Sequence, residues 1–110
     1  MNRKILILAL LFTAGSFAGC KKASSSYTPD CSGKAKSYKT DVAPIMQTTC
    51  IGCHYFGSGI VDLSTYATVF SSRSSIRDDV ASGKMPQTGT LTDSQKNNIL
   101  CWIDSGAANN

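Results

Sequence analysis

The segment Cys50-Ile51-Gly52-Cys53-His54 places two thiols and an imidazole within five consecutive residues. Two cysteines at this spacing are suited to form thioether bonds with the two vinyl groups of one porphyrin, and a histidine directly after them is placed to ligate the porphyrin iron. His54 is the only histidine of the chain. The pattern predicts one covalently attached haem c, held by Cys50 and Cys53, with His54 as an axial iron ligand.

Two other chemistries use a similar cysteine pair. A thiol–disulfide oxidoreductase would use Cys50 and Cys53 as its redox pair, but such motifs usually follow a strand in a βαβ unit, and no strand pattern precedes Cys50. A structural zinc site needs further ligands, which are present only if Cys31 and Cys101 converge on the motif. Haem attachment is the interpretation that the residues favour, and these two remain as alternatives.

The N-terminal residues 1–19 have the pattern of an export signal. Arg3 and Lys4 form a basic region, an apolar stretch runs from Ile5 to Phe12, and small residues follow. The apolar stretch is shorter than the roughly 20 residues that span a bilayer. We therefore expect cleavage and export, and the loss of Arg3 and Lys4 lowers the net charge from +4 to +2.

The end of this signal, Phe17-Ala18-Gly19-Cys20, resembles the lipobox of bacterial lipoproteins. In that family the signal is cleaved before the cysteine, which then carries acyl chains. The resemblance implies lipidation of Cys20 and a membrane-anchored protein that faces the periplasm. The alternative is ordinary signal cleavage after Ala18, which would leave an exported protein without an anchor.

Beyond the signal, residues 20–37 begin with a polar, Ser-rich stretch and predict a flexible tether to a single domain over residues 38–110. In this domain apolar residues recur at helical spacing, and no segment alternates as a strand does. The expected fold class is all-α. The spacing predicts a helix from Tyr38, with Thr40 or Asp41 as its cap, and a second over Leu63–Ser72, with Ser64 as its cap. A third is expected over Ser75–Ser82. The capping sequence Thr92-Asp93-Ser94-Gln95 predicts the last helix, over Asp93–Ser105.

Five cysteines are present, and Cys31 and Cys101 remain once lipid and haem have taken the others. In an exported chain such a pair most often forms a disulfide, which here would tie the first ordered residues to the last helix. The alternative is that one or both are free and buried. A domain this small has a marginal core, so a disulfide and a bulky cofactor are both expected to stabilise it.

The remaining composition excludes several functions. No basic stripe is interleaved with aromatic side chains, so nucleic acid is not an expected partner. The chain has no glutamate, and its only histidine is assigned to iron, so no acid–base or nucleophilic constellation is visible. These residues favour an electron carrier over an enzyme.

Four stretches of the domain are similar to class I cytochrome c, and more closely to the short lipid-anchored monohaem cytochrome c domains of Bacteroidetes-type bacteria. The stretches are Asp41–Met46, Cys50–His54, Lys84-Met85-Pro86 and Cys101–Ala107. The resemblance covers about residues 38–108. It implies three to four helices around one covalent haem and transfer of single electrons, with a membrane oxidoreductase, a terminal oxidase or other cytochromes as partners.

The resemblance also assigns Met85 as the second axial ligand, because the class I family places its axial methionine in a loop before the last helix. Methionine and histidine together raise the reduction potential of a haem. The alternative is that Met85 fills an apolar gap, and Met46 is expected to pack in the core. Where the family has a proline whose carbonyl orients the histidine, this chain has residues 59–62, and a backbone carbonyl is expected to accept the imidazole N–H.

Several further residues are candidates for contact with a haem. Leu63, Tyr66 and Trp102 are candidates for packing against it, and Arg73, Arg77 or Tyr66 for contact with its propionates. The alternative is that each is an ordinary surface or core residue. The second hypothesis for function is a haem-based sensor or ligand-binding module, which would need an open or labile sixth position on the iron. Binding of carbon monoxide separates this hypothesis from an electron carrier.

Overall fold

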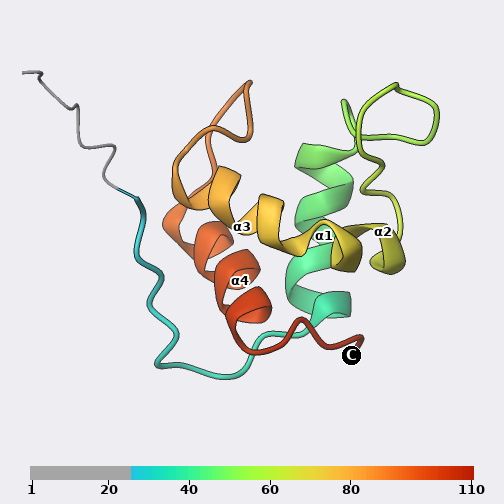
Figure 1. The fold of residues 1–110 in the computed structure, drawn as a ribbon. Helices are drawn as coiled ribbons and strands as arrows, with labels where there is room; N and C mark the ends of the chain where they lie inside the picture. The colour runs from blue at the N-terminus through green and yellow to red at the C-terminus, as the bar shows by residue number, and fades with distance from the viewer. Residues whose placement is uncertain (1–25) are drawn as a thin grey trace, which may run out of the picture.

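The computed structural model describes residues 26–110, in which every regular element is a helix (Figure 1). In chain order these are the π-helix η1 (Tyr38–Val42), α1 (Ala43–Ile45), the π-helix η2 (Met46–Cys50), α2 (Tyr66–Ser71), α3 (Arg73–Ala81) and α4 (Asp93–Asp104). No strand occurs over residues 26–110, which confirms the all-α class for this part of the chain. The expected signal peptide and Cys20 lie outside the described residues. No described helix is long and apolar enough to cross a bilayer.

The elements η1, α1 and η2 follow one another without a break and lead directly into the cysteine motif. Ser37 is the N-cap: its side chain accepts from the Thr40 N–H at 3.5 Å, and its own N–H donates to Asp41 Oδ2 at 2.7 Å. The N-cap is therefore Ser37, and the two residues that were expected as caps, Thr40 and Asp41, form hydrogen bonds with it. Pro44 has no N–H, and it lies in the short α1 between the two wider π-helical stretches.

The middle helices begin and end at other residues than expected. Thr65, and not Ser64, caps α2, because its side chain accepts from the Thr68 N–H while the Thr68 side chain accepts from the Thr65 N–H. The α2 helix is correspondingly shorter than the expected segment 63–72. The α3 helix starts at Arg73, two positions before the expected start, and Ser72 is both the C-cap of α2 and the N-cap of α3.

The last helix, α4, begins as the sequence predicts. Thr92 is its N-cap and forms a reciprocal capping box with Gln95. The helix packs against α3 and against η1, and α2 packs against α3. This arrangement buries a contiguous core, whose largest fully buried side chains are Trp102, Met46, Ile99, Leu100, Val42 and Val69.

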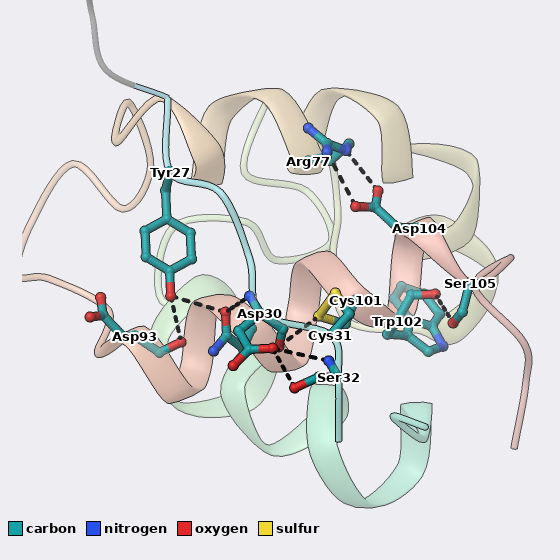
Figure 2. The surroundings of a disulfide bond; sticks show 11 residues. Tyr27, Asp30, Cys31, Ser32, Arg77, Asp93, Cys101, Trp102, Asp104 and Ser105 are labelled. Atoms are coloured by element: carbon teal, nitrogen blue, oxygen red, sulfur yellow. Dashed lines mark hydrogen bonds and ion pairs between the residues drawn. A yellow bond between two sulfur atoms is a disulfide. The ribbon is translucent and has the colours of Figure 1, made fainter. Parts of the chain in front are cut away.

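Cys31 and Cys101 form a disulfide, with their Cα atoms 5.5 Å apart (Figure 2). Cys101 lies in α4 and is buried, whereas Cys31 lies in the irregular segment before η1 and is exposed. The pairing expected from the number of cysteines is thus present in the structure. Within residues 26–110, the two cysteines that remain free are Cys50 and Cys53.

The segment before η1 is attached to the helices by more than this disulfide. The Tyr27 N–H donates to the Ala81 carbonyl at 2.7 Å, and the Tyr27 hydroxyl donates to Asn97 Oδ1 at 2.9 Å. The N–H of Asp30 donates to the same Asn97 oxygen at 3.0 Å (Figure 2). The flexible tether expected over residues 20–37 is therefore fixed to the domain from Tyr27 onward.

Candidate functional site

One cavity of about 410 Å³ brings together the residues that the sequence assigns to haem binding. Its wall contains Cys50, Cys53, His54 and Met85. Met85 is 31 residues after His54 and reaches the cavity from the loop before α4. The volume falls in the range of about 300–1,000 Å³ that is typical of ligand pockets. The fold thus provides one space to which both predicted axial ligands and both predicted attachment thiols have access.

Most of the remaining wall is apolar, as in most sites for small molecules and cofactors. The apolar side chains come from η2, α3, α4 and the loops between the helices: Met46, Ile60, Val61, Leu63, Ile76, Val80, Pro86, Leu91 and Ile99. Polar side chains complete it: Thr49, Ser72, Ser75, Asp79, Gln87 and Thr88. An apolar wall with a few polar groups fits a flat, largely apolar macrocycle that carries carboxylates at its edge.

Two of the lining residues are exposed although they are apolar. Ile60 is 54% exposed and Val61 is 47% exposed. Both border the cavity, so an apolar ligand in the cavity would cover them. Burial of such side chains stabilises a complex by roughly 25 cal/mol per Å² of apolar surface, and large exposed apolar residues beside a cavity are typical of binding sites.

The His54 imidazole is held in one orientation by a backbone carbonyl. Its Nδ1 lies 2.8 Å from the Val61 oxygen. A carbonyl only accepts hydrogen bonds, so Nδ1 carries the proton and Nε2 keeps the lone pair that a metal ligand requires. The Leu63 N–H also donates to the His54 carbonyl at 2.9 Å and fixes the backbone of the histidine. The backbone carbonyl that was expected to accept the imidazole N–H is therefore that of Val61.

The two motif cysteines lie at the end of η2, on a turn that keeps them close to the histidine. The Cys50 carbonyl accepts from the Cys53 N–H at 3.2 Å and from the His54 N–H at 2.9 Å. Burial raises the pKa of the Cys50 thiol above its usual value. Burial thus disfavours the thiolate form of this sulfur, whereas an oxidoreductase needs a reactive thiolate. The motif also follows a helix and not a strand, so both observations weigh against the thiol–disulfide alternative.

The zinc alternative depended on convergence of Cys31 and Cys101 on the motif. These two sulfurs are bonded to each other, which removes them as metal ligands. Over residues 26–110 no group of three or more His, Cys, Asp or Glu side chains is arranged to hold a metal ion. The described residues therefore give no support to a structural zinc site.

The two methionines of the domain have different surroundings. Met46 is 1% exposed and belongs to the core, as expected. Met85 is half-buried and borders the cavity, in a loop that is fastened to α3: its N–H donates to the Asp79 carbonyl at 3.0 Å, and Lys84 Nζ lies 3.3 Å from Asp79 Oδ1. A methionine in this position is available to a ligand in the cavity, and its role as an axial ligand stays a prediction.

The expected haem-packing residues divide into two groups. Leu63 lines the cavity, but Tyr66 and Trp102 do not. Both belong to an aromatic cluster with Tyr38, whose ring centroid lies 5.0 Å from that of Tyr66 and 5.3 Å from that of Trp102. The Tyr66 hydroxyl donates to the Ala107 carbonyl at 2.9 Å. In the structure Tyr66 and Trp102 pack in and against the core, and their contact with a haem stays a prediction.

The expected propionate ligands are also engaged elsewhere. Arg77 forms an ion pair with Asp104, with Nε 2.7 Å from Oδ1. The guanidinium of Arg73 lies 4.0 Å from the centroid of the Phe70 ring and donates to the Phe70 carbonyl. Neither arginine lines the cavity, and Tyr66 is absent from its wall as well.

Sequence reasoning missed the polar face that α3 presents to the cavity. Ser72, Ser75 and Asp79 line the cavity together with Ile76 and Val80. Residues at these spacings share one face of a helix, because three and four positions correspond to about one turn. The same helical spacing is present in the sequence. It was not recognised as a face toward a cavity because it mixes serine and aspartate with aliphatic residues, whereas a core face is usually apolar throughout.

Comparison of the chain with models of protein families, with curated proteins and with solved structures gave no match. The functional assignment accordingly rests on the chemistry of the motif and on the cavity into which the fold places it. Cys50, Cys53 and His54 supply what covalent haem attachment requires, and Met85 supplies a second donor atom to the same space.

Proposed function

We propose that this protein is a monohaem c-type cytochrome that carries single electrons between membrane or periplasmic redox partners. The observation that carries the proposal is the cavity shared by Cys50, Cys53, His54 and Met85. Its helices would then form a small class I cytochrome c-like fold, with one haem in the space between η2, α3 and α4. A membrane oxidoreductase, a terminal oxidase or another cytochrome would exchange electrons with it.

The attachment chemistry fits the two free cysteines. Each thiol would add across one vinyl group, with the sulfur bonding to one vinyl carbon and the hydrogen to the other, so no oxidant or reductant is consumed. Cys50 and Cys53 are both free and both border the cavity, as this addition requires. The turn after η2 keeps the two sulfurs on the same side of the chain as the imidazole.

The protein's own residues explain why the site would carry electrons instead of binding gases. Bound haem iron supplies a centre that alternates between the ferric and ferrous states. His54 would hold the iron through Nε2, because the Val61 carbonyl holds its Nδ1, and Met85 would supply its thioether as the second protein ligand. The mostly apolar wall would limit the access of water to a bound haem, and His54 and Met85 would be the residues that hold its iron.

The location proposed for the protein is the periplasmic face of a membrane, through lipid on Cys20. The chain is attached to the domain from Tyr27 onward. Seven residues of extended backbone span at most about 25 Å, which sets the reach between the lipid and the domain. The haem site would thus stay close to the membrane in which partner oxidoreductases reside.

Carbon monoxide distinguishes a carrier from a haem-based sensor. The ferrous holoprotein is expected to resist carbon monoxide, because Met85 occupies the sixth position, and to show one reversible one-electron wave in protein-film voltammetry. The measurement is the visible spectrum of the reduced protein before and after equilibration with the gas. Rapid and complete formation of the carbon monoxide adduct would contradict the carrier and favour the sensor.

A further inference from the structure

The loop that carries Met85 has no regular structure of its own. It runs from the end of α3 at Ala81 to the start of α4 at Asp93, and the chain forms no helix between them (Figure 1). Met85 borders the cavity from this loop. Its thioether is available to a bound haem only while the loop keeps it at the cavity, so the contacts that fix the loop decide how firmly Met85 is held.

One residue of α3, Asp79, contacts two successive residues of this loop. Its carbonyl accepts from the Met85 N–H at 3.0 Å, and its Oδ1 lies 3.3 Å from Lys84 Nζ. The carbonyls in the last turn of a helix have no partner within the helix, so the Asp79 carbonyl is available to the loop. Gly83 has φ of 75°, a left-handed conformation that lets the chain turn back toward the helix. Asp79 thus holds the loop through both its backbone and its side chain.

The end of α3 that carries Asp79 is itself fixed to the rest of the domain. Val80 and Ala81, the next two residues, are buried in the core. The Ala81 carbonyl accepts from the Tyr27 N–H at 2.7 Å. The helix end is therefore packed against the core and bonded to the segment before η1, so the contacts of Asp79 fix the loop relative to the cavity.

The ion pair between Asp79 and Lys84 lies at the edge of the cavity. Asp79 lines the cavity and its side chain is 29% exposed, whereas Lys84 does not line it and its side chain is 68% exposed. Among the ion pairs in the part of the chain that the structure describes, no other includes a residue of the cavity wall. The pair therefore joins the wall of the cavity to the residue that directly precedes Met85.

We propose, on the basis of the proposed cytochrome function, that Asp79 is a positioning residue for the sixth iron ligand. Together with Lys84 it holds the loop so that the Met85 thioether stays available to the haem iron, and it does so without contact with the iron. Partly exposed ion pairs stabilise a structure only modestly. Loss of the pair should therefore loosen Met85 without releasing it, because the backbone hydrogen bond between Asp79 and Met85 remains in any side-chain variant.

The test is the rate at which the ferrous holoprotein forms its carbon monoxide adduct in saturating gas, since the release of Met85 limits this rate. Asp79→Asn and Lys84→Gln each remove the ion pair with little change in volume, and each should raise the rate by about two- to fivefold. The double variant should be no faster than the faster single variant, because both substitutions remove one interaction. Lys84→Arg keeps the charge and should bind at the wild-type rate.

The reduction potential separates this positioning role from a direct effect of charge on the iron. The ferric site carries one more positive charge than the ferrous site. Loss of the Asp79 carboxylate should therefore raise the potential, and loss of the Lys84 ammonium should lower it. The effect of charge thus has opposite signs in the two variants, whereas a loosened loop accelerates carbon monoxide binding in both.

Lys96→Gln is the matched control. Lys96 Nζ lies 3.5 Å from Asp93 Oδ1 on α4, and neither residue lines the cavity, so the variant removes a similar ion pair away from Met85. The proposal is overturned if Lys84→Gln binds carbon monoxide no faster than Lys96→Gln does. It is also overturned if Asp79→Asn alone is faster, because its carboxylate would then act on the haem directly and not through the loop.

Failure of this proposal is distinguishable from failure of the proposed function. A chain that acquires no covalent haem, or a wild-type holoprotein that binds carbon monoxide rapidly, contradicts the electron carrier before any variant is compared. A holoprotein that resists the gas equally in the wild type and in all the variants contradicts the role of Asp79 alone. The helical circular dichroism of each variant shows whether the substitution has altered the fold.

Discussion

Replacement of both Cys31 and Cys101 by serine is expected to lower the free energy of unfolding by about 4 kcal/mol, and the midpoint of thermal unfolding by roughly 15–30 °C. The bridge joins residues 70 apart in the sequence, so its loss releases a long loop in the unfolded chain. It also frees the segment that Tyr27 and Asp30 attach to Asn97. Calorimetry of the haem-loaded double variant against the wild type measures the effect.

A reductant provides the control for this prediction. Reduction of the wild-type disulfide should reproduce the loss of stability, and the same reductant should leave the double variant unchanged. In the double variant, the serine at position 101 places a hydroxyl where a buried sulfur stood, which could itself lower the stability. If the reduced wild type loses as much stability as the double variant, the loss is due to the missing bridge and not to the hydroxyl. A midpoint that falls by less than about 5 °C in both experiments would contradict a stabilising bridge.

Met85→Leu is expected to open the sixth coordination position while it keeps the volume of the side chain. Loss of the thioether should abolish the weak charge-transfer band at the red end of the ferric spectrum and allow carbon monoxide to bind to the ferrous protein. The reduction potential should fall by on the order of 0.1 V, a fraction of the roughly 0.8 V that axial ligands span. Visible spectroscopy and voltammetry of the purified variant measure all three effects.

Met46→Leu is the matched control for this substitution. Met46 is the other methionine of the domain and also borders the cavity, but it is buried in the core next to the motif. A volume-conserving replacement there usually costs less than about 1.5 kcal/mol, and the charge-transfer band should persist. If the band survives in Met85→Leu, or is absent from the wild type, Met85 is not the sixth ligand.

The sequence alone indicates those features that depend on a few neighbouring residues or on the number of cysteines. The pairing of Cys31 with Cys101, which was expected from the number of cysteines, is present in the structure. The motif at Cys50 to His54 is recognised by its spacing alone, and the haem that it predicts is untested. The capping box at Thr92 was equally local. These features involve few residues, so the rest of the fold does not alter their interpretation.

The sequence did not show which buried side chains face the cavity. Ile99 and Trp102 lie on the same helix and are both fully buried, but Ile99 lines the cavity and Trp102 packs against Tyr38. Helical periodicity indicates that a side chain is buried and does not identify its neighbours. For this reason the sequence could not show that Leu63 borders the cavity while Tyr66 and Trp102 do not.

The sequence also did not show which of several neighbouring polar residues caps a helix. Ser37 caps η1 where Thr40 or Asp41 was expected, and Thr65 caps α2 where Ser64 was expected. All of these side chains are able to accept a hydrogen bond from a helix N-terminus, so the path of the backbone decides which one does. The carbonyl of Val61 had no sequence signature at all, since every residue has a carbonyl group.

The most direct test of the central claim is the pyridine haemochrome assay, combined with the intact mass of protein exported in the presence of the haem-attachment machinery. The account predicts one haem per chain that remains bound after denaturation and extraction with acidified acetone. Replacing either Cys50 or Cys53 by alanine should reduce the covalent links by one. A wild-type chain that carries no haem, or whose haem is extracted completely, would contradict the account.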